Sequence, residues 1–183
     1  MTRLLLLAAL TALGALGCER GKEPPVAAAN PLADSADQVM FGVSTIITDR
    51  GVLRAQLQAD TAYFFDGSTR IEARNEKVTF YTSTGQQNAV LTSKEGTYRP
   101  NESVMEARKH VVVVSVDGRR LETSQLNYNQ ASNQISSDSA FVLNEPTRRL
   151  EGIGFDSDPD LKNLHVHRVK TGAGTFNLPG QTP

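Results

Sequence analysis

The sequence predicts a single all-β domain, an open antiparallel β-jelly roll built from stacked hairpins. Between about Gln38 and residue 170, apolar and polar residues alternate with a period of two, as side chains do on half-buried strands. Turn-forming groups such as Asp66-Gly67-Ser68 and Asp117-Gly118 separate the alternating stretches. No window of ten or more residues in this range has the apolar spacing of an amphipathic helix.

Length and composition further limit the kinds of protein that this chain can be. The 183 residues suit one domain with a sizeable core, and one cysteine cannot form an intramolecular disulfide. A hydrophobic fraction of 39% and a charged fraction of 21% argue against a disordered tail or a multi-span membrane protein. The net charge of −1 excludes a strongly basic nucleic-acid binder.

Residues 1–17 are predicted to be a lipoprotein signal peptide. A charge-free run from Leu4 to Gly17 follows Arg3, and it is shorter than the roughly 20 apolar residues of a spanning helix. The sole cysteine, Cys18, follows directly and resembles the lipidated cysteine of a bacterial lipobox. An unpaired thiol in an oxidising compartment favours lipidation of Cys18 over an ordinary secreted protein with an incidental cysteine.

The remaining boundaries follow from composition. Residues 18–37 contain Pro, Ala and charged residues without a hydrophobic period, which predicts a lipidated N-terminus and flexible tether. The domain is expected over 38–170, with a flexible tail over 171–183. Within the domain, the alternation predicts short strands at 39–48, 53–63, 69–73, 77–82, 89–98, 103–107, 110–116, 120–128, 134–136, 140–144, 149–155 and 164–169.

Some of these strands repeat along the chain. The stretch 91–98 resembles 121–128, and weaker copies occur at 57–63 and 150–155. An aromatic residue recurs near the end of each copy: Tyr63, Tyr98, Tyr128 and Phe155. A single hairpin cannot bury its own apolar face, so the hairpins are expected to stack, which leaves two open sheet edges.

The order of these stretches resembles the LptC family of lipopolysaccharide export. The resemblance rests on 91–98, on Val111-Val112-Val113-Val114, on 121–123 with the hairpin at Tyr128, and on 150–155 followed by Asp158-Pro159-Asp160. It covers about residues 36–170 and implies an OstA-like β-jelly roll. Family members more usually carry an uncleaved transmembrane helix, whereas this chain carries a lipobox-like sequence. Glu19 occupies the place where Asp would favour retention in the inner membrane.

The resemblance implies a non-enzymatic transport protein on the periplasmic side of a bacterial membrane. Such a protein receives lipopolysaccharide from inner-membrane ABC transporter subunits and passes it to the next OstA-like periplasmic bridge protein. The family places the anchor in the inner membrane, and the lipobox leaves the outer membrane open. A second interpretation is a periplasmic β-lipoprotein that acts as a scaffold or polysaccharide-binding module, which the absence of Trp and 6% aromatic content weaken.

Candidate groove and edge residues follow from the alternation and this resemblance. The inward apolar face is expected either to hold acyl chains or to form a packed core, and these alternatives stay open. Its positions are Leu57, Ala59, Tyr63, Ile71, Phe80, Leu91, Met105, Val111, Val113, Leu121, Ile135 and Phe141. The partner edges are expected at 39–47, facing the transporter, and at 150–169, facing the next bridge protein. Their candidate residues are Val39, Phe41, Val43, Leu164 and Val166.

Neither catalytic residues nor a cofactor is predicted. Nucleophile elbows, phosphate-binding loops and dinucleotide fingerprints are absent from the sequence. The strand carboxylates Glu95, Glu122 and Glu151 suit solvated faces better than a glycosidase pair.

Two features of the sequence weakly resemble metal sites, and neither is interpreted as one. His165 and His167 share one strand face, but a surface pair is favoured over a metal site because no third ligand lies nearby in sequence. Asp156, Asp158 and Asp160 resemble the start of a calcium loop, yet the glycine at position 6 and the acid at position 12 are missing, so a polar turn is favoured.

Overall fold

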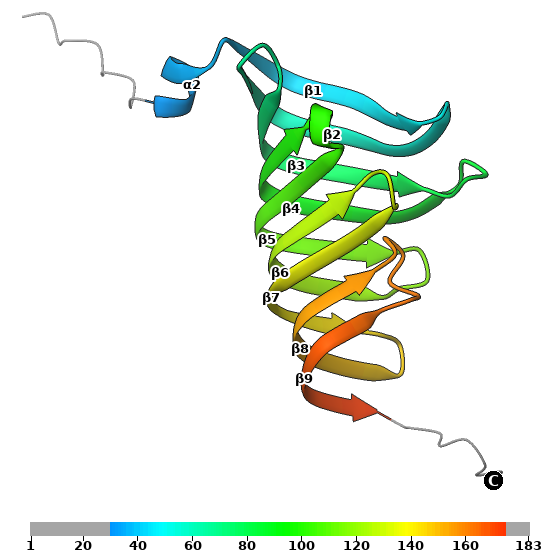
Figure 1. Ribbon diagram of the computed structural model, residues 1–183. Coiled ribbons are helices and arrows are strands. Elements are labelled where there is room, and N and C mark those ends of the chain that lie inside the picture. The colour runs from blue at the N-terminus through cyan, green and yellow to red at the C-terminus, as the bar shows by residue number, and fades with distance from the viewer. Residues whose placement is uncertain (1–29, 175–183) are drawn as a thin grey trace, which may run out of the picture. The chain divides into compact units, whose positions relative to one another are not determined.

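The computed structural model describes residues 30–174, and in them nine strands form one antiparallel sheet in chain order (Figure 1). The chain divides into two compact units, of which the second, from Pro31 onward, contains every element described here. The predicted signal peptide 1–17, Cys18, the tether up to residue 29 and the end of the tail, 175–183, lie outside the described residues.

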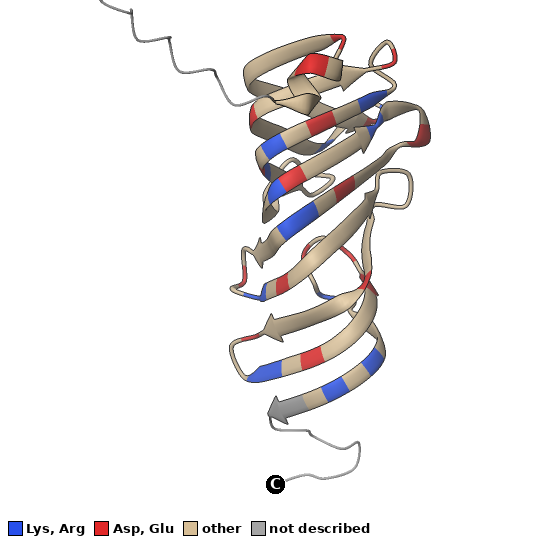
Figure 2. Ribbon diagram, turned by 90° about the vertical axis from the view of Figure 1, so that its left-hand side faces the viewer, with Lys and Arg blue, Asp and Glu red and all other residues tan. Residues whose placement is uncertain are grey.

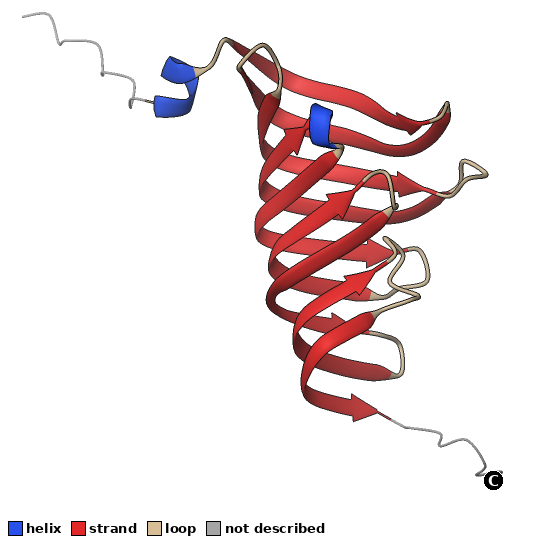
Figure 3. Ribbon diagram, in the orientation of Figure 1, coloured by secondary structure: helices blue, strands red, loops and turns tan. Residues whose placement is uncertain are grey.

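The prediction of an all-β, open antiparallel jelly roll is confirmed (Figure 3). The described helical elements are α2 (Pro31–Ser35), within the range expected to be tether, and the short 3-10 helix η1 (Pro100–Glu102). The strands are β1 (Gln38–Asp49), β2 (Val52–Phe65), β3 (Arg70–Tyr81), β4 (Gln87–Arg99), β5 (Val104–Ser115), β6 (Arg120–Asn129), β7 (Gln134–Asn144), β8 (Arg148–Ser157) and β9 (His165–Gly174). Strand β9 therefore continues four residues beyond the expected end of the domain at 170.

Three pairs of predicted short strands are wrong, because each pair is one long strand. The ranges 69–73 and 77–82 belong to β3, 103–107 and 110–116 to β5, and 134–136 and 140–144 to β7. Asn75 in β3 has a φ of 49°, and Lys109 and His110 in β5 have φ values of 62° and 54°. Left-handed residues of this kind bend a strand and shift its pairing without reversing the chain.

These bends form a corner that crosses the whole sheet. Pairing is interrupted at neighbouring positions on successive strands, as between Phe41 and Val43 in β1 and between Arg74 and Glu76 in β3. The interruption continues through β4 to β8 as register shifts or unpaired positions. Each strand consequently curves around the interior of the roll (Figure 3). Buried side chains of different strands form one core cluster there.

The core fills the roll from the middle strands onward. Phe80 on β3 packs edge to face against Tyr128 on β6, with ring centroids 4.9 Å apart, and Phe141 on β7 packs against Phe155 on β8 at 5.1 Å. The repeated aromatic residues each occupy an even-numbered strand, one per hairpin: Tyr63 on β2, Tyr98 on β4, Tyr128 on β6 and Phe155 on β8. The repeat in the sequence is therefore the hairpin repeat of the sheet.

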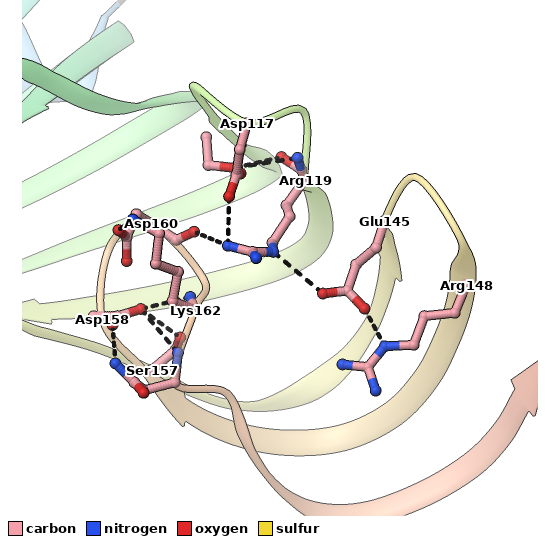
Figure 4. A network of polar contacts seen from close by, with 10 residues as sticks. Asp117, Arg119, Glu145, Arg148, Ser157, Asp158, Asp160 and Lys162 are labelled. Carbon is pink, nitrogen blue, oxygen red and sulfur yellow. Dashed lines mark hydrogen bonds and ion pairs between the residues drawn. The ribbon is translucent and has the colours of Figure 1, made fainter. Parts of the chain in front are cut away.

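Three loops are tied together at one rim of the roll (Figure 4). Arg119, before β6, contacts Asp117 Oδ2 at 2.7 Å, Glu145 Oε1 in the β7–β8 loop at 3.3 Å and the Asp160 carbonyl in the β8–β9 loop at 3.4 Å. The β8–β9 loop also places Leu161 in the core, where it is 1% exposed. The β8–β9 loop thus contributes a buried side chain to the core, whereas the sequence indicated only a polar turn.

Candidate functional site

An apolar cavity of about 310 Å³ lies between the first four strands. Its volume is at the lower end of the range typical of ligand pockets. It is bordered by β1, the first strand of the sheet, whose only hydrogen-bonded neighbour among the described strands is β2. Its lining is mostly aliphatic and aromatic: Met40, Val43, Ser44, Thr45, Ile47, Leu57, Ala62, Phe64, Ile71, Ala73, Glu76, Gly96 and Tyr98.

Eleven of the twelve predicted groove positions face the interior. The prediction is wrong for Tyr63, because the corner at Asp60 changes which side chains of β2 face inward. Its neighbours Ala62 and Phe64 line the cavity, whereas the Tyr63 ring lies 5.8 Å from the Arg74 guanidinium on the outer face.

All twelve positions are buried except Ile71, which is half-buried. Leu57 and Ile71 line the cavity. Phe80, Leu91 and Met105 border a gap of only about 10 Å³, which is at the lower limit for a single water.

The other predicted positions do not line this cavity. Val111, Val113, Leu121, Ile135 and Phe141 belong to the close-packed core, together with Ala59. The interior therefore contains a cavity among β1 to β4 and is close-packed beyond β4. A role of any of these residues in lipid binding stays a prediction.

Glu76 is a cavity residue that the sequence analysis did not identify. It is the first residue of β3 after the corner, and it is 5% exposed. Ser93, its register partner on β4, donates a hydrogen bond from Oγ to Glu76 Oε1 at 2.7 Å. The other oxygen, Oε2, lies against Gly96, where an added Cβ would come within 1.9 Å of it. A glycine at position 96 is thus what leaves room for the carboxyl group.

Burial raises the pKa of Glu76 from 4.5 to about 7, although the hydrogen bond from Ser93 lowers it. Desolvation disfavours the charged form of a carboxyl group, and a nearby cation would oppose this effect. Among the described residues, no ion pair joins Glu76 to a lysine, arginine or histidine. Near neutral pH about half of the Glu76 carboxyl groups are therefore protonated, and the protonated form can both donate and accept hydrogen bonds.

The N-terminal edge of the sheet is β1, as predicted, and it exposes large apolar side chains. Phe41 is 79% exposed and Ile46 64%, while Val39 and Val43 are half-buried. Large exposed apolar side chains on an edge strand favour the approach of a partner.

The C-terminal edge is β9 alone, so the predicted range 150–169 is partly wrong. Leu150 belongs to β8, which is paired on both sides, and Leu164 precedes β9. Val166 is half-buried and packs against the core, while Val169 is 59% exposed.

Positively and negatively charged residues recur close together along successive strands (Figure 2). Many are pairs two residues apart on one strand, such as Arg120 with Glu122 at 2.8 Å and Arg149 with Glu151 at 2.8 Å. The predicted solvated carboxylates thus pair with cations, and Glu95 likewise contacts Lys109 at 2.8 Å. No carboxylate of this set lines the cavity.

The histidines and aspartates of β8 and β9 make local contacts. The rings of His165 and His167 are 6.2 Å apart, and His167 Nε2 lies 2.7 Å from Asp156 Oδ2. Asp158 accepts a hydrogen bond from the Lys162 backbone N–H at 2.8 Å, so it orders its own loop. Within residues 30–174, no three such side chains are grouped in a way that would hold a metal ion, and no helix is long and apolar enough to cross a bilayer.

Comparisons with known proteins agree with the sequence pattern. A family model described as "Lipopolysaccharide-assembly, LptC-related" matches residues 4–173. No curated protein matches the chain in sequence. Among solved structures, the chain is similar to LptH, described as the LptA-homologous periplasmic component of the lipopolysaccharide transport device of Pseudomonas aeruginosa. The identity is 15% and the TM-score 0.46, with 62% of this chain and 82% of that chain covered.

Proposed function

The chain belongs to the LptC-related family of lipopolysaccharide-assembly proteins, and from this premise we propose that it is a non-enzymatic, membrane-anchored carrier of lipopolysaccharide. It receives the glycolipid from an inner-membrane ABC transporter and passes it to the next OstA-like protein of a periplasmic bridge. The observation that carries the proposal is the family match over nearly the whole chain, together with an apolar cavity beside an open sheet edge.

The cavity supplies the chemistry that acyl chains need. Each methylene moved from water into such a site contributes about 0.8 kcal/mol, so partial insertion of one chain already gives useful affinity. The lining residues Leu57 and Ile71 are in place to contact a chain, and Met40 lies at the exposed β1 side. Because the interior is close-packed beyond β4, an acyl chain is expected to enter the cavity at the β1 end.

The two sheet edges suit strand addition by protein partners. Strand β1, with its exposed Phe41, is assigned to the transporter side. Strand β9 is assigned to the next bridge protein, where the exposed cations Arg168 and Lys170 favour an acidic partner strand. A crosslinking amino acid at Val169 tests this edge better than a proline at Val166, because Val166 also packs against the core.

The anchor is assigned to Cys18, which lies outside the described residues. Acyl chains on this residue would hold the roll at the periplasmic surface, with residues up to about 30 as a tether. The inner membrane is the anchor site by family, because the transporter that supplies the lipid resides there.

Site-specific photocrosslinking in living cells tests the proposal. A photoreactive amino acid at Met40, which lines the cavity, is expected to capture lipopolysaccharide. The matched control is Phe41, the next residue of β1, which does not line the cavity and is 79% exposed. Absence of glycolipid at Met40, or equal capture at both positions, would contradict the proposed carrier function.

A further inference from the structure

Glu76 is an unusual residue for a cavity that only shields hydrocarbon. An acyl chain offers no hydrogen-bond partner, and burying a carboxyl group without sufficient partners costs free energy. Leu57, Ile71 and Ala73 line the same cavity and show that apolar side chains suit this interior. Glu76 is moreover the only Asp, Glu, Lys, Arg or His residue among the lining residues.

The carboxyl group is held in place by its neighbours but is not neutralised by them. Ser93 binds one oxygen, and Gly96 makes room for the other. The nearest charged residues along β3 and β4 are Lys77 and Lys94, both exposed, and Lys94 Nζ contacts Asn75 Oδ1 at 3.3 Å. Glu76 therefore does not serve as half of a structural ion pair within the described part of the chain.

We propose that Glu76 and Ser93 form a polar subsite that binds a hydroxyl group carried on an acyl chain in this cavity. This inference deepens the proposed carrier function and rests on it. A hydroxyl group both donates and accepts, which matches a carboxyl group whose second oxygen has no recorded hydrogen-bond partner among the described residues. The subsite lets the cavity distinguish a hydroxylated acyl chain from a plain one of equal length.

Native mass spectrometry measures this preference directly. The full chain in a mild non-ionic detergent is mixed with equal amounts of methyl 3-hydroxydecanoate and methyl decanoate, and the two adducts are counted by mass. Wild-type protein is expected to favour the hydroxylated ester by roughly two- to tenfold, the effect of one hydrogen bond. The Glu76→Leu variant is expected to lose this preference while still binding both esters.

Two further variants serve as controls. They test whether a changed ratio of adducts arises from misfolding or from unequal partition of the two esters into detergent. Glu76→Gln keeps a donor and an acceptor, so it should retain a preference that Glu76→Leu lacks. Glu122→Gln, which alters an exposed carboxylate on β6, should behave as wild type. Equal binding of the two esters by wild type, or an unchanged ratio in Glu76→Leu, would overturn the subsite alone. Absence of both adducts would overturn the subsite and count against the carrier function as well.

Discussion

Replacing Glu76 with Gln should remove a specific pH dependence of stability. Burial raises the pKa of Glu76 from 4.5 to about 7 in the folded protein, while the unfolded chain releases this proton near the ordinary value. Between these pH values the unfolded state binds fewer protons than the folded state, so the free energy of unfolding falls as pH rises. Each pKa unit corresponds to about 1.4 kcal/mol, which gives a loss of about 3 kcal/mol by pH 8.

Urea unfolding of the full wild-type and Glu76→Gln chains, followed by circular dichroism from pH 4 to 8, measures this effect. The variant should gain stability relative to wild type as pH rises, by up to about 3 kcal/mol, with little difference at pH 4. Other groups shift oppositely: the hydrogen bond from Lys109 lowers the pKa of Glu95. Their contributions are common to both proteins and cancel in the difference. A difference that stays constant across this range would refute the assignment of a raised pKa to Glu76.

Three further changes have defined outcomes. Gly96→Ala should destabilise the fold by about 1–3 kcal/mol in urea unfolding, because its Cβ would collide with Glu76 Oε2, and by clearly less when Glu76→Ala is also present. Leu161→Ala should cost about 2–5 kcal/mol in the same assay, since it empties a buried site in the β8–β9 loop; a cost near zero would show that the loop does not plug the core. Cys18→Ala should leave an unprocessed precursor on a denaturing gel, and normal processing would contradict lipidation.

The strand alternation predicts which side chains point inward only within a strand segment that the corner does not interrupt. Leu91 and Leu121 are buried as predicted because a period of two is a local property of extended backbone. The prediction is wrong at three points of the corner, where it divides one strand into two. Asn75 and the pair Lys109-His110 interrupt the alternation with polar residues, as a turn does, yet the chain continues in the same strand. Only pairing with the neighbouring strands distinguishes a bend from a reversal.

Local sequence patterns could not predict the cavity or its carboxyl group, and the reason is again the corner of the sheet. In β3 the buried positions change from odd to even numbers across Asn75, so Glu76 faces inward where a continued alternation would turn it outward. One signal in the sequence was available: Gly96 lies in an otherwise regular strand, and a strand glycine often marks a close approach by another group. The partner of that glycine, and the space beside it, depend on how four strands pack together.

The distribution of packing along the roll bears on the proposed carrier function. Beyond the cavity, the Phe80–Tyr128 pair fills the interior, and the Tyr128 hydroxyl is held by a hydrogen bond with Asn133 Oδ1 at 3.0 Å. An acyl chain that enters beside β1 can advance past β4 along the interior only if these rings move, which sacrifices packing worth about 1 kcal/mol for an aromatic pair besides its burial. In the proposed carrier function, the cavity would thus be a holding site at the receiving end of the roll. Onward transfer towards β9 would then require either a partner that opens the interior or a chain that leaves by the way it entered.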